Sequence, residues 1–232
     1  MILLKSVLEY GEIEYDLPNA AKHISMPKTQ AAEISMFSEF EIRRIRNCAD
    51  TGNSIGLGIL LALFTGLRIG EICALTWSDI DTAEQLIRVR KTLLRISNQG
   101  DSAQKTAIVI DKPKSKSSLR DVPIPTFLLE PIARLKASQD SQKYFLTCSP
   151  RPTEPRTYTL RFKSFLKRIG VHYRNFHALR HTFATECIKS GVDVKTLSEL
   201  LGHSSVKITL DRYVHLDMQL KRRQLEKLYS NL

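Results

Sequence analysis

Four residues whose types suit chemistry on a phosphate occur in one stretch near the end of the chain. The stretch from Phe176 to His215 reads FHALRHTFATECIKSGVDVKTLSELLGHSSVKITLDRYVH. His177 and Arg180 are three residues apart, so a helix would present both on one face. His203 and Tyr213 follow after two more short segments. A guanidinium binds anions well and a tyrosine hydroxyl can act as a nucleophile, so these spacings predict one phosphate-binding site.

Arg68 is an earlier candidate for the same site. It follows an apolar run that ends at Thr65-Gly66, and an unpaired guanidinium would be costly to bury there. Glu71 lies three residues further on, where it either forms an ordinary helix ion pair or orients Arg68 toward an anion. The residues by themselves leave both interpretations open.

Each candidate also has an ordinary structural interpretation. An HxxR pair is common on helix surfaces, His203 could cap a helix, and Tyr213 could be a half-buried core residue. What favours a site is the occurrence of all of them, in this order, with the polar basic segment Lys112–Ser118 upstream.

Composition bounds the protein class. The 232 residues suffice for one large or two small domains with a substantial core. The net charge of +11 predicts a polyanionic partner, and residues 151–232 hold 16 Lys and Arg against 7 Asp and Glu. The four cysteines show no zinc-ligand spacing, and no apolar run approaches the ~20 residues of a membrane span. We therefore expect a cytoplasmic protein with no metal and no membrane partner.

The elements around the candidates are predicted from periodicity and caps. SEFE at Ser38 is a capping box that opens a helix through EIRRIRNCA. Ile55–Phe64 is apolar on nearly all sides and predicts a core helix that ends at Gly66, after which a second helix restarts at Leu67.

The middle of the chain changes period. LIRVRKTLLRI, TAIVID and LRDVPIP predict three short strands, with Lys112–Ser118 as a hairpin tip between the last two. Beyond Pro125 the pattern returns to helices, and Asp217–Leu228 predicts a final charged amphipathic helix. The predicted fold class is α+β, mainly helical with one small three-stranded antiparallel sheet.

Four segments now carry a resemblance. TGLRIGEICALTWSDID, PKSKSSLRDVPIP, HALRHTFAT and LGHSSVKITLDRYVH resemble the four signature blocks of the tyrosine recombinase (phage-type integrase) family. They are most similar to integrases of bacterial conjugative transposons and phages. The resemblance extends from about Ser38 to Tyr213, and the blocks together are far more specific than any one alone.

The resemblance implies catalytic roles for six positions: Arg68, Lys114, His177, Arg180, His203 and Tyr213. Tyr213 would be the nucleophile, and Glu71 would support the first clamp arginine. Lys114 would be the hairpin lysine, with Lys116 as the alternative because hairpin tips slip by a residue or two.

The chemistry suits these residue types. A tyrosine hydroxyl can attack a DNA phosphodiester and conserve the bond as a 3′-phosphotyrosine. Two arginines can hold the non-bridging oxygens where charge builds up, histidines can donate hydrogen bonds or move protons, and a lysine can be the general acid. Because guanidinium groups take the place of a metal, the resemblance implies no cofactor.

The resemblance also implies partners and a domain plan. We expect double-stranded DNA, a tetramer of this chain on DNA, accessory DNA-bending proteins and a bacterial nucleoid location. Residues 1–35 would end a missing upstream helical domain or form an ordinary N-terminal arm, 36–213 would be the catalytic domain, and 214–232 would pack on a neighbouring copy or fold back. Further basic residues would neutralise DNA phosphates or only be solvated: Arg151, Arg156, Arg161, Lys163, Lys167, Arg168 and Arg174.

The expected activity is site-specific recombination that integrates or excises a mobile element. Two alternative functions are compatible with the same residues. One is a type IB-like DNA relaxing enzyme with no partner exchange, and the other is a non-catalytic DNA-binding remnant. An RNA-binding module is disfavoured because the chain has no RNP-type aromatic run and no GxxG loop of the expected kind.

Overall fold

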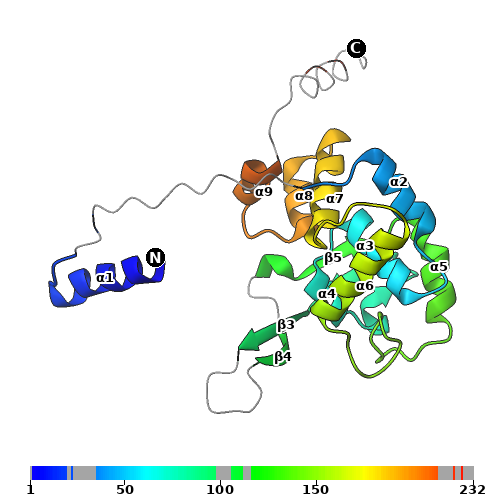
Figure 1. Ribbon diagram of the computed structural model, residues 1–232, viewed down its shortest axis with the longest axis horizontal. Helices are drawn as coiled ribbons and strands as arrows, with labels where there is room; N and C mark the ends of the chain where they lie inside the picture. The colour runs from blue at the N-terminus through cyan, green and yellow to red at the C-terminus, as the bar shows by residue number, and fades with distance from the viewer. Residues whose placement is uncertain are drawn as a thin grey trace. The chain divides into compact units, whose positions relative to one another are not determined.

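The computed structural model describes residues 2–19, 22, 35–97, 106–111, 116–213, 222 and 226 (Figure 1). The chain divides into two compact units, Met1–Glu33 and Ile34–Leu232. In the first unit, helix α1 (Ile2–Tyr15) exposes apolar side chains such as Leu3 and Ile13. The helix predicted for Asp217–Leu228 lies outside the described residues, apart from Arg222 and Glu226. The three-part division at residues 35 and 213 stays a prediction.

The second unit begins with the predicted cap. Helix α2 (Glu39–Cys48) starts at Ser38, whose hydroxyl accepts from the Glu41 amide while the Ser38 amide donates to the Glu41 carboxylate. The capping-box prediction is therefore confirmed. Helix α3 (Ser54–Thr65) follows and is buried on nearly every side, as its apolar sequence predicted.

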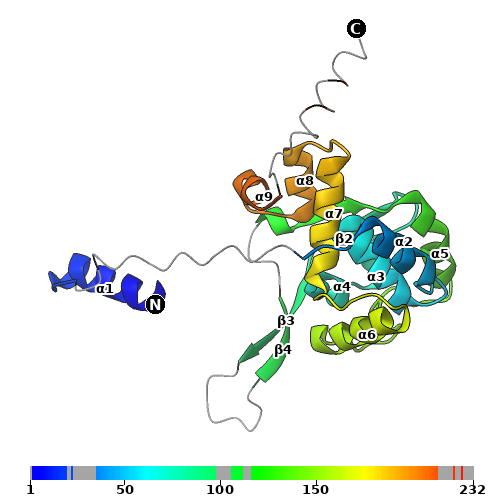
Figure 2. The ribbon, with the colours of Figure 1, turned by 45° about the horizontal axis from the view of Figure 1, so that its top comes forward.

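Helix α3 lies within a layer of other helices, as Figure 2 shows. Helices α5 (Thr126–Lys136), α6 (Pro155–Arg168) and α7 (His177–Lys189) surround the core to which α3 contributes. Aromatic side chains tie the layers together, with Phe162 packed edge-on against both Phe37 and Phe176. This core holds α7 directly against α3, which sets the HxxR residues beside the end of α3.

The described strands form two sheets. Strands β1 (Ile80–Asp81), β2 (Leu86–Val89) and β5 (Arg120–Pro123) make a three-stranded antiparallel sheet in that order. Strands β3 (Thr92–Ser97) and β4 (Thr106–Asp111) form a separate two-stranded ribbon (Figure 1). The predicted fold class is confirmed, and TAIVID and LRDVPIP contain strands β4 and β5 as predicted, but the first predicted strand and the predicted hairpin are wrong.

Two corrections follow from this pairing. The run LIRVRKTLLRI is not one strand, because the chain leaves the first sheet at Arg90-Lys91. There the Arg90 side chain forms an ion pair with Asp121, and the Lys91 ammonium forms one with Asp79. The hairpin predicted between TAIVID and LRDVPIP is wrong, since β4 pairs with β3 and β5 pairs with β2. Residues 112–115 lie outside the described residues.

A second, smaller core lies between α7 and helices α8 (Val194–Leu201) and α9 (Val206–Tyr213). Its buried residues are Ala184 of α7, Leu197 and Leu201 of α8, and Tyr213 of α9. Gly202 ends α8 in the left-handed conformation. Within the part of the chain that the structure describes, no helix is long and apolar enough to cross a membrane.

Gly66 ends α3 with φ +68° directly beneath this second core. A Cβ there would lie 2.5 Å from Phe183 Cδ1 and 2.9 Å from Leu201 Cδ2. We expect Gly66→Ala to lower the free energy of unfolding by roughly 2–4 kcal/mol, because backbone strain and overpacking add. Chemical denaturation followed by circular dichroism measures the change.

Gly170→Ala is the matched control. Gly170 has φ +64°, but its added Cβ would meet only the end of the Arg44 side chain, with Nη2 at 3.4 Å and Cζ at 3.9 Å. We expect this variant to lose only the backbone component, about 1 kcal/mol. Equal losses in the two variants would contradict the packing role assigned to Gly66.

Candidate active site

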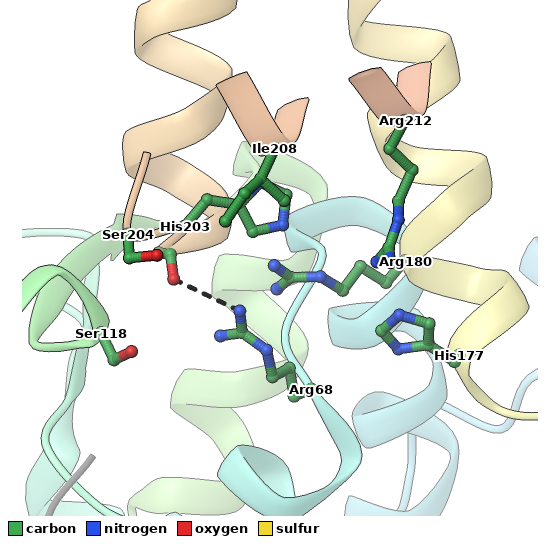
Figure 3. A pocket seen from close by; sticks show the side chains of 9 residues that line it. Arg68, Ser118, His177, Arg180, His203, Ser204, Ile208 and Arg212 are labelled. Atoms are coloured by element: carbon green, nitrogen blue, oxygen red, sulfur yellow. Dashed lines mark hydrogen bonds between the residues drawn. The ribbon is translucent and has the colours of Figure 1, made fainter. Parts of the chain in front are cut away.

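Helix ends and loops from distant parts of the sequence surround one open pocket of about 310 Å³. Figure 3 shows the side chains of Arg68, His177 and Arg180 converging on it from below and from the right, with Arg212 reaching in from above. The lining residues are Arg68, Ser118, His177, Arg180, Gly202, His203, Ser204, Ile208 and Arg212.

Arg68 is the N-cap residue of helix α4 (Ile69–Ala74). Its backbone N–H and its Nη1 donate to the two oxygens of Glu71, at 2.8 and 2.9 Å, and its Nη2 donates to the Gly202 carbonyl at 3.3 Å. The side chain is 35% exposed and lines the pocket. Glu71 therefore does both things that the sequence left open: it pairs with Arg68 and it aims the guanidinium at the pocket.

Glu71 also binds a second arginine. Arg120 at the start of β5 donates to both Glu71 oxygens, at 3.0 and 2.9 Å, and the two side chains are 6% and 5% exposed. Arg120 Nε reaches the Leu200 carbonyl at 2.6 Å. Burial acts to raise the pKa of Glu71, but the hydrogen bonds and charge of Arg120, together with the charge of Arg68, outweigh it and lower this pKa.

Arg180 is almost fully buried and binds two helix ends. Its guanidinium donates to the Gly66 carbonyl at 2.8 Å and to the Leu201 carbonyl at 2.7 Å. Both carbonyls lie at helix C-termini, where the helix dipole attracts a cation. Burial and the charge of Arg68 lower the pKa of Arg180 to about 9, so it remains charged at neutral pH. Its position beside Arg68 gives the pocket two fixed guanidiniums.

The histidines around the pocket are neutral at pH 7. Burial, with the charges of His181 and Arg180, lowers the pKa of His177 to about 4. Burial and the charges of Arg180 and Arg68 lower the pKa of His203 to about 3. His203 Nδ1 is hydrogen-bonded to the buried Thr209 hydroxyl at 2.8 Å, which fixes the ring. The positive charge of the pocket therefore comes from its arginines.

Tyr213 lies at the end of α9 behind this lining and is 8% exposed. Its ring is parallel to that of His203, with centroids 6.4 Å apart, and its hydroxyl is 2.8 Å from His181 Nδ1. Burial raises the pKa of Tyr213, against the opposing charges of Arg180 and Arg212. The phenol is therefore protonated at neutral pH.

The structure brings most of the sequence candidates together. Arg68, His177, Arg180 and His203 line the pocket, and Tyr213 adjoins it. Lys114 lies outside the described residues. The backbone of Lys116 begins the short 3-10 helix η2 (Lys116–Ser118), but its side chain also lies outside them. The catalytic roles of all six stay predictions.

Sequence reasoning missed four contributors: Arg120, His181, Thr209 and Arg212. For His181 a signal existed, because it is four residues after His177 and so lies on the same helix face. Arg212, next to Tyr213, could also have been considered. The roles of Arg120 and Thr209 depend on contacts across the fold that no local pattern contains.

The other basic candidates are spread over several surfaces. Arg156 lines a hollow that continues from Arg68 and His177. Arg174 is paired with Glu41 at 2.8 Å, and the Lys163 ammonium lies 5.4 Å from the centre of the Tyr173 ring. Arg161 and Arg168 line a hollow along α6, and Lys167 lines another beside it. Arg156 therefore shares a hollow with two candidate site residues, Arg68 and His177. Among the residues described, no group of three or more His, Cys, Asp and Glu is placed to hold a metal ion.

Comparisons with known proteins identify the family. The profile of the phage integrase family matches residues 35–220. A tyrosine recombinase XerC-like protein of Caldanaerobacter subterraneus is 36% identical over 97% of this chain and 63% of its own length. The ICEBs1 integrase of Bacillus subtilis is 31% identical over 72% of this chain and 46% of its own length. The chain belongs to the phage integrase (tyrosine recombinase) family, and it spans about half to two thirds of these relatives.

Solved structures share the fold. The Tn1549 transposon integrase, in complex with transposon right end DNA, superposes with a TM-score of 0.74 at 24% identity over 97% of this chain and 76% of that one. The XerA recombinase superposes with a TM-score of 0.61 at 24% identity, over 97% of this chain and 73% of that one. The family resemblance predicted from the four sequence blocks is confirmed.

The buried Glu71–Arg120 pair predicts a pH-dependent stability. Since the pKa of Glu71 is lower when folded, its contribution is complete above the unfolded carboxyl pKa of ~4.3 and is lost as the pH falls through the folded value. We expect Glu71→Gln to lower the free energy of unfolding at pH 7 by about 3 kcal/mol, because Arg120 keeps a buried charge without its partner. Denaturant unfolding from pH 7 to pH 3 measures both effects.

Glu130→Gln is the control. Glu130 forms an exposed ion pair with Arg134 and is 77% exposed, so its loss should change stability by less than about 0.5 kcal/mol. If Glu71→Gln matched this small effect and kept the wild-type pH profile, the structural role of the buried pair would be wrong.

Proposed function

We propose that this chain is the catalytic part of a site-specific DNA recombinase that integrates or excises a mobile element. The reaction would be transesterification through a 3′-phosphotyrosine at Tyr213, without a metal. The observation that carries this proposal is the convergence of Arg68 and Arg180 on one pocket, with a buried tyrosine hydroxyl beside it. Membership of the phage integrase family supports the same activity.

The proposed roles follow from the geometry. Arg68 and Arg180 would bind the non-bridging oxygens of the scissile phosphate, since each is held by its own fixed partners and still lines the pocket. Neutral His177 and His203 would donate N–H hydrogen bonds to the same oxygens. Lys114 would protonate the leaving 5′-oxygen, with Lys116 as the alternative.

The proposed partner is double-stranded DNA. A similar fold in the Tn1549 integrase is seen with transposon end DNA, and this chain carries a net charge of +11. Among the basic residues outside the pocket, Arg156 would contact the DNA backbone next to the scissile phosphate, because it lines the hollow beside Arg68. We also propose that the working form is a tetramer on DNA, that residues 214–232 pack on a neighbouring copy, and that an upstream helical domain ends within residues 1–35.

Tyr213→Phe tests the central step. The probe is a pool of nicked duplexes that covers the DNA on both sides of the gene for this chain, incubated without magnesium. We expect the wild-type chain to form a covalent protein–DNA adduct on a denaturing gel and Tyr213→Phe to form none, because the phenyl ring has no nucleophile. Tyr173→Phe, an exposed tyrosine away from the pocket, should behave as the wild type.

The other outcomes identify the alternatives. DNA binding with no adduct from the wild-type chain would contradict the catalytic proposal and favour a binding module. Adduct formation by particles that stay monomeric on DNA in sedimentation would favour a DNA relaxing enzyme over a recombinase.

Separate Lys114→Ala and Lys116→Ala variants test the general acid. We expect Lys114→Ala to slow adduct formation by ~10²-fold or more and Lys116→Ala to change it only slightly. A 5′-bridging phosphorothiolate at the scissile position should restore the Lys114→Ala rate, since a sulfur leaving group needs no proton. An unaffected Lys114→Ala variant would contradict our assignment.

A further inference from the structure

His181 is the histidine in hydrogen-bond contact with the candidate nucleophile. Its Nδ1 lies 2.8 Å from the Tyr213 hydroxyl oxygen, whereas His203 uses its own Nδ1 to bind Thr209. The His177 and His181 rings pack in a T-shaped pair, with centroids 4.4 Å apart and an interplanar angle of 86°. His181 therefore lies between the pocket histidine and the hydroxyl that would attack.

We propose that His181 Nδ1 is the general base that accepts the Tyr213 hydroxyl proton during DNA cleavage. This inference rests on the proposed function and adds a catalytic residue to it. His177 and His203 line the pocket and would contact the phosphate, so the proton acceptor and the phosphate-binding histidines are different residues.

The protonation states suit an acceptor. Burial, with the charges of Arg212 and Arg180, lowers the pKa of His181 to about 4, so its imidazole is neutral at pH 7. The Tyr213 phenol is protonated there, because burial raises its pKa. With the ring proton on Nε2, Nδ1 has a free lone pair directed at the hydroxyl.

The surrounding charges link proton transfer to substrate. The groups that face His181 are Arg180 and His177 on α7, and Arg212 and Tyr213 on α9. Both arginines disfavour an imidazolium in the free protein, and both line the pocket. A bound phosphate would offset their charge and raise the pKa of His181, so the base would gain strength when DNA is in place. Arg212 would also stabilise the developing phenolate.

The atoms of the step balance. The Tyr213 oxygen forms a bond to phosphorus as the bond from phosphorus to the 5′-oxygen breaks. The hydroxyl proton moves to His181 Nδ1, and the leaving 5′-oxygen takes a proton from the proposed general acid, Lys114. In the rejoining step both protons return, so no oxidant, nucleotide or other reactant is consumed.

The experiment compares His181→Ala, His181→Asn and the matched control His172→Ala, an exposed histidine in the α6–α7 loop. Full-length chains react with the same pool of nicked duplexes, carrying either the natural 5′-oxygen or a 5′-bridging phosphorothiolate. We expect both His181 variants to form adduct ~10²-fold or more slowly with either leaving group, and His172→Ala to match the wild type. A defect that remains with the phosphorothiolate distinguishes His181 from the general-acid lysine, because a sulfur leaving group should restore the rate of the lysine variant.

Two further readouts separate a base from a merely positioning residue. Asparagine can hydrogen-bond Tyr213 but cannot accept its proton at neutral pH, so a wild-type rate in His181→Asn would overturn the proposal. In His181→Ala, added imidazole should restore part of the rate, and the rate should rise with pH as the phenol ionises unaided. Thermal unfolding of each variant confirms that it is folded, and a folded His181→Ala that imidazole does not accelerate counts against the base.

The remaining outcomes distinguish failure of the proposed function from failure of the base assignment. No adduct from the wild-type chain would overturn the proposed function and the base assignment together. A wild-type adduct that forms equally fast in His181→Ala would overturn the base assignment alone. A faster reaction in His181→Ala would identify the hydrogen bond as a brake on Tyr213 and would also overturn it.

Discussion

The buried carboxylate of Glu71 is the interaction on which the rest of the site depends. It lies between Arg68 at the start of α4 and Arg120 at the start of β5, with hydrogen bonds to both side chains. A carboxylate in this position would be costly without its two cations. Arg120 in turn reaches Leu200 near the end of α8, and Arg68 reaches Gly202. Through these two arginines, the Glu71 carboxylate links the sheet, α4 and the loop that carries His203.

Arg180 connects the remaining elements by the opposite arrangement, a buried cation among carbonyl oxygens. Its partners Gly66 and Leu201 end α3 and α8, where backbone carbonyls have no helical partner. The pocket is thus built from helix ends, and its guanidiniums are held by protein oxygens before any ligand arrives. Such preorganised donors stabilise developing negative charge without reorganising during the reaction.

The same arrangement explains the protonation states of the site residues. Burial and neighbouring arginines keep His177, His181 and His203 neutral at pH 7. The arginines supply the positive charge, and the histidines remain free to donate hydrogen bonds or accept protons. A phosphate in the pocket would change the charge balance for all of them at once, which makes substrate binding and proton transfer parts of one electrostatic event.

The sequence by itself determined the local features and the family. The capping box at Ser38, the apolar α3, the glycine stop at Gly66 and the four family blocks all follow from short-range patterns, because caps and helix periodicity are local. It also indicated four of the nine residues that line the pocket, Arg68, His177, Arg180 and His203. The tertiary structure alone decided that β4 pairs with β3, that Arg120 shares Glu71 with Arg68, and that His181 meets Tyr213. The residues in the last two contacts are 32 or more positions apart in the sequence. Burial of charge brings Arg120 to Glu71, and the packing of α9 on α7 brings Tyr213 to His181. No local pattern encodes either contact.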